Sequence, residues 1–400
     1  MNQSKQQAQF SEVSPEIQKK AASARSALKR AKRVVVKVGT NVVMHPSGDL
    51  ALGRLCSLIE EIVALKRQGR EVILVTSGAI GLGSGRLGVT GDLLPRKQAC
   101  AAVGQVLLMA VYEQAFSRFR VPVAQLLLTE EDFASRRRYL NLRNAVSELL
   151  TLGVLPIVNE NDTVSTAEIE ISGGRAGAFG DNDKLSALVM SKIDGEVLVL
   201  LTDVDGLYTA PGPRRGGKLI PVVAELDEEL GRSARGPSRG GRGGMKTKLE
   251  AARICTASGG IAVIANGTMP GILGKLFSGE PVGTIFVPRR RLSGRKRWIA
   301  FASSPAGRVT VTNGARQALE ERGASLLFAG VVKIEGDFER GDVVAICDEA
   351  GREFARGMAN HGSDRARTLI GKHSKDVARI THEPNFDCFI TRDNLVLVRR

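Results

Sequence analysis

The sequence of 400 residues is poor in cysteine, histidine and aromatic side chains. Its five cysteines are odd in number and scattered, with no CxxC pair, which is typical of reduced thiols and not of a disulfide framework. The four histidines lie far from the cysteines, so no zinc-type metal site is expected. No run approaches the roughly 18 apolar residues that cross a membrane, and no secretory signal is seen. We therefore expect a cytoplasmic protein with no membrane partner.

Positive charge is the one excess, with a formal net charge of +15. Three segments, residues 1–33, 232–242 and 289–297, account for all of this excess and leave the rest of the chain near neutrality. Such segments are either solvated tails and loops or surfaces that meet polyanions, namely nucleotide phosphate or RNA.

Apolar runs with flanking turn residues alternate with helical patterns through the first two thirds of the chain. The predicted strands, apolar on both faces, are 33–39, 71–78, 121–129, 154–162, 196–206 and 261–267. The predicted helices are 54–68, 96–118, 136–150, 184–192 and 246–258. This alternation predicts an α/β sandwich with a largely parallel sheet. Since ligands collect beyond the C-terminal ends of parallel strands, the polar tips TSG, NEND, TDVDG and ANG should converge on one edge.

The sequence predicts four parts. Residues 1–30 form a charged N-terminal extension that is partly helical or disordered, 31–288 the α/β domain, and 289–304 a basic linker. Residues 305–390 show shorter, strand-like patterns separated by turns, which predict a small β-rich domain.

Several motifs suit phosphate binding, although the Walker A pattern GxxxxGK[ST] is missing. The GxGxxG match at 83–88 does not open a helix, which favours a glycine-rich substrate loop over a dinucleotide site. Lys37 lies in an apolar strand, where its stem reaches the surface or its ammonium meets an anion. Glycine-rich 241–252 runs into a helix whose first turn holds Lys246 and Lys248. These lysines oppose the helix dipole, so an anionic partner is favoured over a mobile surface loop.

Polar residues at the strand tips suit an amino-acid substrate. Ser77 is not in a GxSxG elbow, so its hydroxyl and the backbone amides suit a carboxylate better than nucleophilic catalysis. The acidic side chains of NEND and GDND suit a substrate ammonium or Mg²⁺, or merely cap the following helix. Taken together, the motifs favour phosphoryl transfer to an amino acid.

A series of blocks in one order resembles the bacterial glutamate 5-kinase family over residues 31–400. The blocks are VVKVGTNV, VTSGAIGLG, KQACAAVGQ, VPVAQLLLT, LPIVNENDTV, FGDNDKLSALV, LLTDVDGLYT, GRGGMKTKLEAA and GTIFVP. The C-terminal part resembles a PUA domain. The resemblance implies the amino-acid-kinase fold and ATP-dependent phosphorylation of the γ-carboxylate of L-glutamate to L-glutamyl 5-phosphate, the first step of proline biosynthesis.

The resemblance also assigns roles to residues. Those implied to be catalytic are Lys37, Asp181 and Lys248, with Asp181 as the aspartate that organises the two lysines. Those implied to bind the substrate are Ser77, Asp162, Asn182 and Asp183. Those implied to bind the nucleotide are Lys37, Thr202, Asp203, Arg242, Gly243, Gly244, Met245, Lys246, Thr247 and Lys248. The cofactors implied are ATP and Mg²⁺, with no dedicated metal-ligating residues.

The family resemblance further implies a homo-oligomer, feedback inhibition by proline, and a downstream glutamyl-phosphate reductase. The chain departs from the family in an insertion near 171–178, in Arg242 where threonine is usual, and in Lys246 where a small residue is common. One alternative is another kinase of the same fold, acting on aspartate, acetylglutamate or a nucleotide. The other is an RNA-binding protein that uses the PUA-like domain and the Arg/Gly-rich loop.

Overall fold

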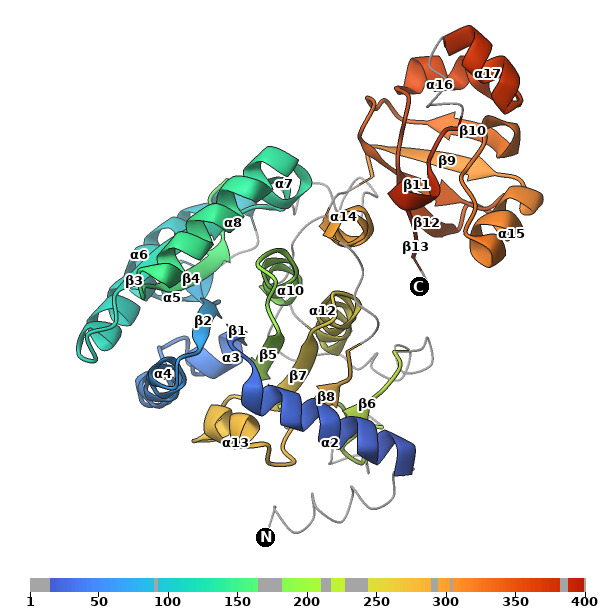
Figure 1. Cartoon of the computed structure of the whole chain (residues 1–400). Coiled ribbons are helices and arrows are strands. Elements are labelled where there is room, and N and C mark those ends of the chain that lie inside the picture. The colour runs from blue at the N-terminus through green and yellow to red at the C-terminus, as the bar shows by residue number, and fades with distance from the viewer. Residues whose placement is uncertain are drawn as a thin grey trace. The chain divides into compact units, whose positions relative to one another are not determined.

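A computed structural model describes residues 15–89, 93–164, 182–209, 217–226, 244–288, 294–302, 305–381 and 388–398. The chain forms two compact units, Met1–Arg291 and Leu292–Arg400. Figure 1 shows the elements of each unit.

The first unit is built on an eight-stranded sheet in the order β3-β4-β2-β1-β5-β7-β8-β6. Its strands are β1 Arg33–Val38, β2 Glu71–Val75, β3 Val123–Leu128, β4 Leu155–Glu160, β5 Val197–Thr202, β6 Val222–Val223, β7 Ile261–Asn266 and β8 Thr284–Phe286. All neighbours from β3 to β7 pair in parallel, whereas β8 runs antiparallel to β7. The predicted α/β fold with a largely parallel sheet is confirmed.

Helices cover this sheet, as expected for strands that are apolar on both faces. They are α2 Pro15–Arg30, α3 Thr40–Val43, α4 Leu52–Arg67, α5 Ala79–Leu87, α6 Leu94–Ser117, α7 Glu130–Ala134, α8 Arg136–Thr151, α10 Asn182–Lys192, α12 Met245–Ala257 and α13 Ile272–Ser278. The five helices predicted from the sequence correspond to α4, α6, α8, α10 and α12. Strands β1, β4 and β5 are almost fully buried, which explains their runs of Val, Leu and Ile.

Helix α2 lies within the residues that the sequence suggested were a charged extension. Ala21, Ala24 and Leu28, at helical spacing, are buried in the same core as the central strands. Arg25 donates from Nη1 to the backbone oxygen of Glu280 at 2.8 Å. Residues 15–30 are therefore part of the packed first unit. Their high charge had suggested an extension outside the domain.

The GxGxxG match falls in and just after α5, so its interpretation as a glycine-rich loop is wrong. Helices α5 and α6 cross at two glycines. A Cβ atom on Gly83 would lie 1.8 Å from the carbonyl oxygen of Cys100, and one on Gly104 would lie 1.7 Å from that of Ala79. These glycines allow two helix backbones to touch, and neither forms a phosphate loop.

Helix α6 corrects the expectation that nothing in the chain could cross a membrane. Its 24 residues are long and apolar enough to do so by length and composition alone. One face, including Leu108, Tyr112 and Phe116, is buried in the core of the first unit. That burial is the ordinary reason for such apolarity in a core helix.

The second unit contains a five-stranded sheet in the order β10-β9-β11-β12-β13. Its strands are β9 Gly307–Val311, β10 Val331–Glu335, β11 Val343–Cys347, β12 Glu353–Met358 and β13 Leu395–Leu397. The helical segments are α14 Gly294–Arg297, η2 Trp298–Ala302, α15 Asn313–Arg322, η3 Phe328–Gly330, α16 Ser363–Leu369, α17 Ser374–Thr381 and η5 Arg392–Asn394. Phe328, Phe338 and Phe389 form the aromatic centre of its core. The β-rich second domain predicted from the sequence is confirmed.

Candidate active site

The C-terminal ends of four central strands bring the polar tips of the sequence together. Lys37 is near the end of β1, Ser77 follows β2, Asn159 is near the end of β4, and Thr202 ends β5. Because these strands are parallel and adjacent, all four residues lie at one edge of the sheet. Helices α10 and α12 begin at the same edge and add the next group of side chains.

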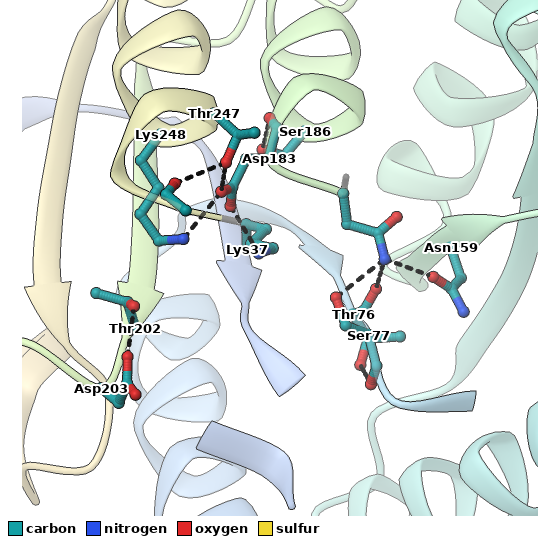
Figure 2. Close-up of polar contacts among 12 residues, drawn as sticks. Lys37, Thr76, Ser77, Asn159, Asp183, Ser186, Thr202, Asp203, Thr247 and Lys248 are labelled. Atoms are coloured by element: carbon teal, nitrogen blue, oxygen red, sulfur yellow. Dashed lines mark hydrogen bonds and ion pairs between the residues drawn. The ribbon is translucent and has the colours of Figure 1, made fainter. Parts of the chain in front are cut away.

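A buried charged cluster is formed by Lys37, Asp183, Thr247 and Lys248 (Figure 2). The Lys37 Nζ lies 2.6 Å from Asp183 Oδ1, and the Lys248 Nζ lies 3.0 Å from Asp183 Oδ2. The Thr247 Oγ1 is 3.0 Å from Asp183 Oδ2 and 2.8 Å from the backbone oxygen of Gly244, and its single hydrogen can be donated to either. One carboxylate thus holds two ammonium groups that come from different elements.

The environment of the cluster keeps Asp183 ionised. Its side chain is fully buried, and those of Lys37 and Lys248 are only 5% and 8% exposed. Burial by itself would raise the pKa of Asp183, but the two ammonium groups more than offset this and lower the pKa to about 2. The cluster therefore carries one negative and two positive charges at neutral pH.

The start of α12 explains why Lys248 needs this partner. Lys248 lies in the first turn of α12, where the backbone N–H groups already create a positive potential. Asp183 lies in the first turn of α10 and is placed favourably for its own helix. Packing α10 against α12 brings the carboxylate to the lysine and leaves one excess positive charge.

A second, neutral cluster surrounds Asn182, the residue next to Asp183. Its Nδ2 lies 2.9 Å from the backbone oxygen of Thr76, 2.9 Å from Ser77 Oγ and 3.0 Å from Asn159 Oδ1, and these three acceptors share its two hydrogens. Asn159 in turn donates from Nδ2 to Gln105 Oε1 at 2.8 Å. Amide and hydroxyl groups thus connect the ends of β2 and β4 with α6 and α10.

The turn after β2 presents further hydrogen-bond donors. Gly78 adopts φ 106°, a left-handed conformation that favours glycine, and α5 begins at the next residue. The first N–H groups of α5 have no partner within the helix and suit an anionic group. Thr76 is fixed from the core side, where its Oγ1 lies 2.8 Å from the hydroxyl of Tyr112.

A third group of polar side chains lies at the end of β5. Thr202 donates from Oγ1 to Asp203 Oδ1 at 3.1 Å, and Asn41 donates from Nδ2 to Asp203 Oδ2 at 2.9 Å. The nearby carboxylate of Asp205 accepts from the hydroxyl of Tyr208 at 3.1 Å. Burial, and then the charge of Asp205, raise the pKa of Tyr208 to about 12, so this hydroxyl is a donor at neutral pH.

Comparison with known proteins identifies the architecture that carries this site. The model of the Amino acid kinase family matches residues 32–265, and that of the PUA domain matches residues 307–381. The glutamate 5-kinase of Moorella thermoacetica is 46% identical over 379 residues, which cover 94% of this chain and 98% of that protein. The chain belongs to the glutamate 5-kinase family. Both the resemblance seen in the sequence and the expectation of a kinase are confirmed.

Two further relatives give the same result. The glutamate 5-kinase of Caldanaerobacter subterraneus subsp. tengcongensis is 45% identical over 373 residues, covering 92% of this chain and 98% of the relative. The glutamate 5-kinase of Gloeobacter violaceus is 46% identical over 372 residues, which cover 91% of this chain and 98% of that protein. The similarity therefore extends over both units.

The structure brings together most of the residues to which the family resemblance gave roles. Asp183 holds both lysines, although the resemblance had given it a place at the substrate and had given the role beside the lysines to Asp181. The predicted residues Asp181, Arg242 and Gly243 and the insertion 171–178 lie outside the described residues. Lys246 is exposed on α12, whereas Gly244, Met245 and Asp162 are half-buried.

Four polar residues of the site were not predicted as functional: Asn41, Thr76, Gln105 and Asn159. Asn159 had a visible signal, because it is a buried amide within an apolar strand and part of the NEND tip. Gln105 had no such signal, because the sequence does not show whether a single glutamine in a long apolar helix is buried or exposed. Its 8% exposure becomes known only when α6 is packed on the sheet.

Proposed function

We propose that the protein transfers the γ-phosphoryl group of ATP to the γ-carboxylate of L-glutamate, forming L-glutamyl 5-phosphate and ADP. The observation that carries this proposal is the buried cluster of Lys37, Asp183 and Lys248 at the ends of the parallel strands. The similarity to glutamate 5-kinases over both units supports the choice of substrate.

The chemistry needs positioned positive charge more than a proton acceptor. A γ-carboxylate is already ionised at pH 7 and attacks phosphorus without a general base. Negative charge on the transferring phosphoryl group is the main obstacle, and fixed ammonium groups stabilise it. Lys37 and Lys248 supply these groups from opposite sides of Asp183, which keeps both in place before the substrates arrive.

The neutral cluster suits the amino-acid end of the substrate. Ser77 accepts from Asn182, so its own hydroxyl hydrogen is left to donate to a carboxylate of glutamate. The first turn of α5 adds backbone donors for the same anion. Asp162, just beyond β4, offers a carboxylate to the substrate ammonium.

The nucleotide would be held by Thr202, Asp203 and the residues that lead into α12, from Arg242 to Lys248. The described residues contain no group of three or more His, Cys, Asp or Glu side chains that could hold a metal ion. Mg²⁺ suits this arrangement as the MgATP complex, because the ion commonly takes most of its ligands from phosphates and water. When bound, it would neutralise part of the polyphosphate charge.

Other properties are proposed from the family resemblance alone. They are a cytoplasmic location, a homo-oligomeric assembly, feedback inhibition by proline and consumption of the acyl phosphate by glutamyl-phosphate reductase. RNA binding as the main function is not favoured, because relatives that span both units are kinases.

The decisive experiment measures acyl phosphate formation. Purified protein with MgATP, L-glutamate and hydroxylamine should form glutamyl hydroxamate, and Lys37→Ala should lower kcat by about 10²- to 10³-fold, as for other lost transition-state stabilisers. The exposed Lys19→Ala on α2 is the matched control and should retain activity.

The alternatives give different results in the same assay. Turnover with aspartate or acetylglutamate but not with glutamate would move the substrate within the fold. No turnover with any of them would overturn the kinase proposal, and RNA binding by the whole chain would then be tested next.

A further inference from the structure

The neutral cluster is a chain of three side-chain amides with a fixed direction. Asn182 donates to Asn159, and Asn159 donates to Gln105. Asn159 and Gln105 are 2% and 8% exposed, so water does not compete freely for these bonds. We call Gln105, Asn159 and Asn182 the amide relay.

One backbone carbonyl determines how every amide in the relay is turned. The Thr76 oxygen can only accept, so Asn182 must turn its Nδ2 toward it. Asn159 must then present Oδ1 to that nitrogen, and its own Nδ2 faces Gln105. Gln105 must therefore present Oε1. Inverting any one amide would place two donors or two acceptors against each other.

Two polar atoms, one at each end of the amide relay, take no part in the hydrogen bonds of the relay. The Nε2 of Gln105 and the Oδ1 of Asn182 are both buried and have no hydrogen-bond partner among the residues that the structure describes. A buried polar atom without a partner is costly, so such atoms are rare outside functional sites. The Oδ1 of Asn182 is an acceptor beside Ser77, where an amino-acid substrate is proposed to bind.

We propose that Gln105 is a positioning residue that makes the site selective for an α-amino acid. By accepting from Asn159, Gln105 keeps the Asn159 Oδ1 on Asn182, and this contact helps to hold Asn182 where its Oδ1 meets the substrate ammonium. Without that acceptor, Asn159 is free to invert and to bring its Nδ2 against the Asn182 Nδ2. The Thr76 oxygen prevents Asn182 from inverting in response, so Asn182 is displaced from the position in which its Oδ1 meets the ammonium. This inference rests on the proposed function and adds to it a residue outside direct reach of the substrate.

The test compares two ligands that differ only in the ammonium group. L-Glutamate is the substrate, and glutarate, which lacks the ammonium, is measured as a competitive inhibitor against it. In Gln105→Met the KM for glutamate should rise about tenfold, because a hydrogen bond to a charged group is lost. The Ki of glutarate, kcat and the KM for MgATP should stay within about twofold of wild type.

Two further variants separate positioning from packing. Gln105→Glu retains an acceptor for Asn159, so its ratio of glutamate KM to glutarate Ki should remain near the wild-type ratio, even where the added charge weakens both. Gln114→Met makes the same change at an exposed position of α6 and should leave all constants unchanged.

Each outcome discriminates between the proposals. A parallel rise of glutamate KM and glutarate Ki in Gln105→Met, or an unchanged ratio, would overturn the role of Gln105 and leave the proposed function standing. The role of Gln105 would also be overturned if the ratio of glutamate KM to glutarate Ki changed as much in Gln105→Glu as in Gln105→Met. Wild-type protein that forms no glutamyl hydroxamate would overturn the proposed function itself, and with it the inference.

Discussion

The two halves of the candidate site begin on adjacent residues of α10 and use opposite chemistry. Asp183 anchors a charged cluster with Lys37 and Lys248, whereas Asn182 anchors a relay of neutral amides. Both halves are mostly buried, and both join several elements at the end of the sheet. The cluster around Asp183 contains charged side chains, whereas the amide relay contains none.

The difference follows from what each half would do. Charge develops where phosphoryl moves, so fixed ammonium groups in a water-poor setting are effective there. At the amino-acid end the charges of the ligand are the same before and after transfer, and only position and selectivity matter. Neutral amides provide direction without the desolvation cost of further ions.

The largest contrast should appear in stability when the two adjacent residues are replaced. Asp183→Asn leaves two buried ammonium groups without a countercharge and should lower the free energy of unfolding by about 3–5 kcal/mol. Asn182→Ala breaks only neutral hydrogen bonds and should cost about 1–2 kcal/mol. Urea unfolding of both variants and the wild type checks this, and equal losses would remove the distinction between the halves.

Acid should affect only the charged half. The pKa of Asp183 is about 2 in the folded protein and 3.8 ordinarily, because the two lysines favour its ionised form. The unfolded chain therefore binds this proton more tightly, and the stabilisation is complete above about pH 4 and lost as pH falls toward 2. The contribution is about 2 kcal/mol.

The measurement is the difference in unfolding free energy between wild type and Asp183→Asn. It should shrink when the pH is lowered from about 5 to about 3, because the unfolded wild-type chain then binds a proton at Asp183 that the folded protein does not yet bind. A difference that stays constant or grows toward acid would contradict the lowered pKa. The same comparison with Asn182→Ala should show little change.

The smallest effect is expected on the core side of the neutral half. Burial raises the pKa of Tyr112 to about 12, so its hydroxyl is neutral and bonds Thr76. Tyr112→Phe should lower the free energy of unfolding by about 0.5–1.5 kcal/mol and leave kcat nearly unchanged. A double-mutant cycle with Thr76→Val measures the coupling, and strict additivity would show that the bond contributes nothing.

The sequence predicted the strands well and singled out Lys37 and Lys248, because both signals are local. Short apolar runs rich in Val, Leu and Ile and bounded by turn residues favour buried strands, and Lys37 and Lys248 stand out against apolar or glycine-rich surroundings. The predicted strands and helices agree with the structure to within a few residues, except around α5 and α2. The glycines of α5 and the charged residues of α2 are residue types that are also common in loops. Local composition therefore led to the wrong interpretation of these two segments.

The sequence alone determined the alternating architecture, the family and the edge of the sheet where the polar tips meet. Tertiary structure decided that Asp183 holds Lys37 and Lys248, because only the packing of α10 fixes the direction in which its side chains point. It also decided that Gly83 and Gly104 serve a helix crossing and that Gln105 meets Asn159. These contacts join residues far apart in the chain, so no local pattern could have contained them.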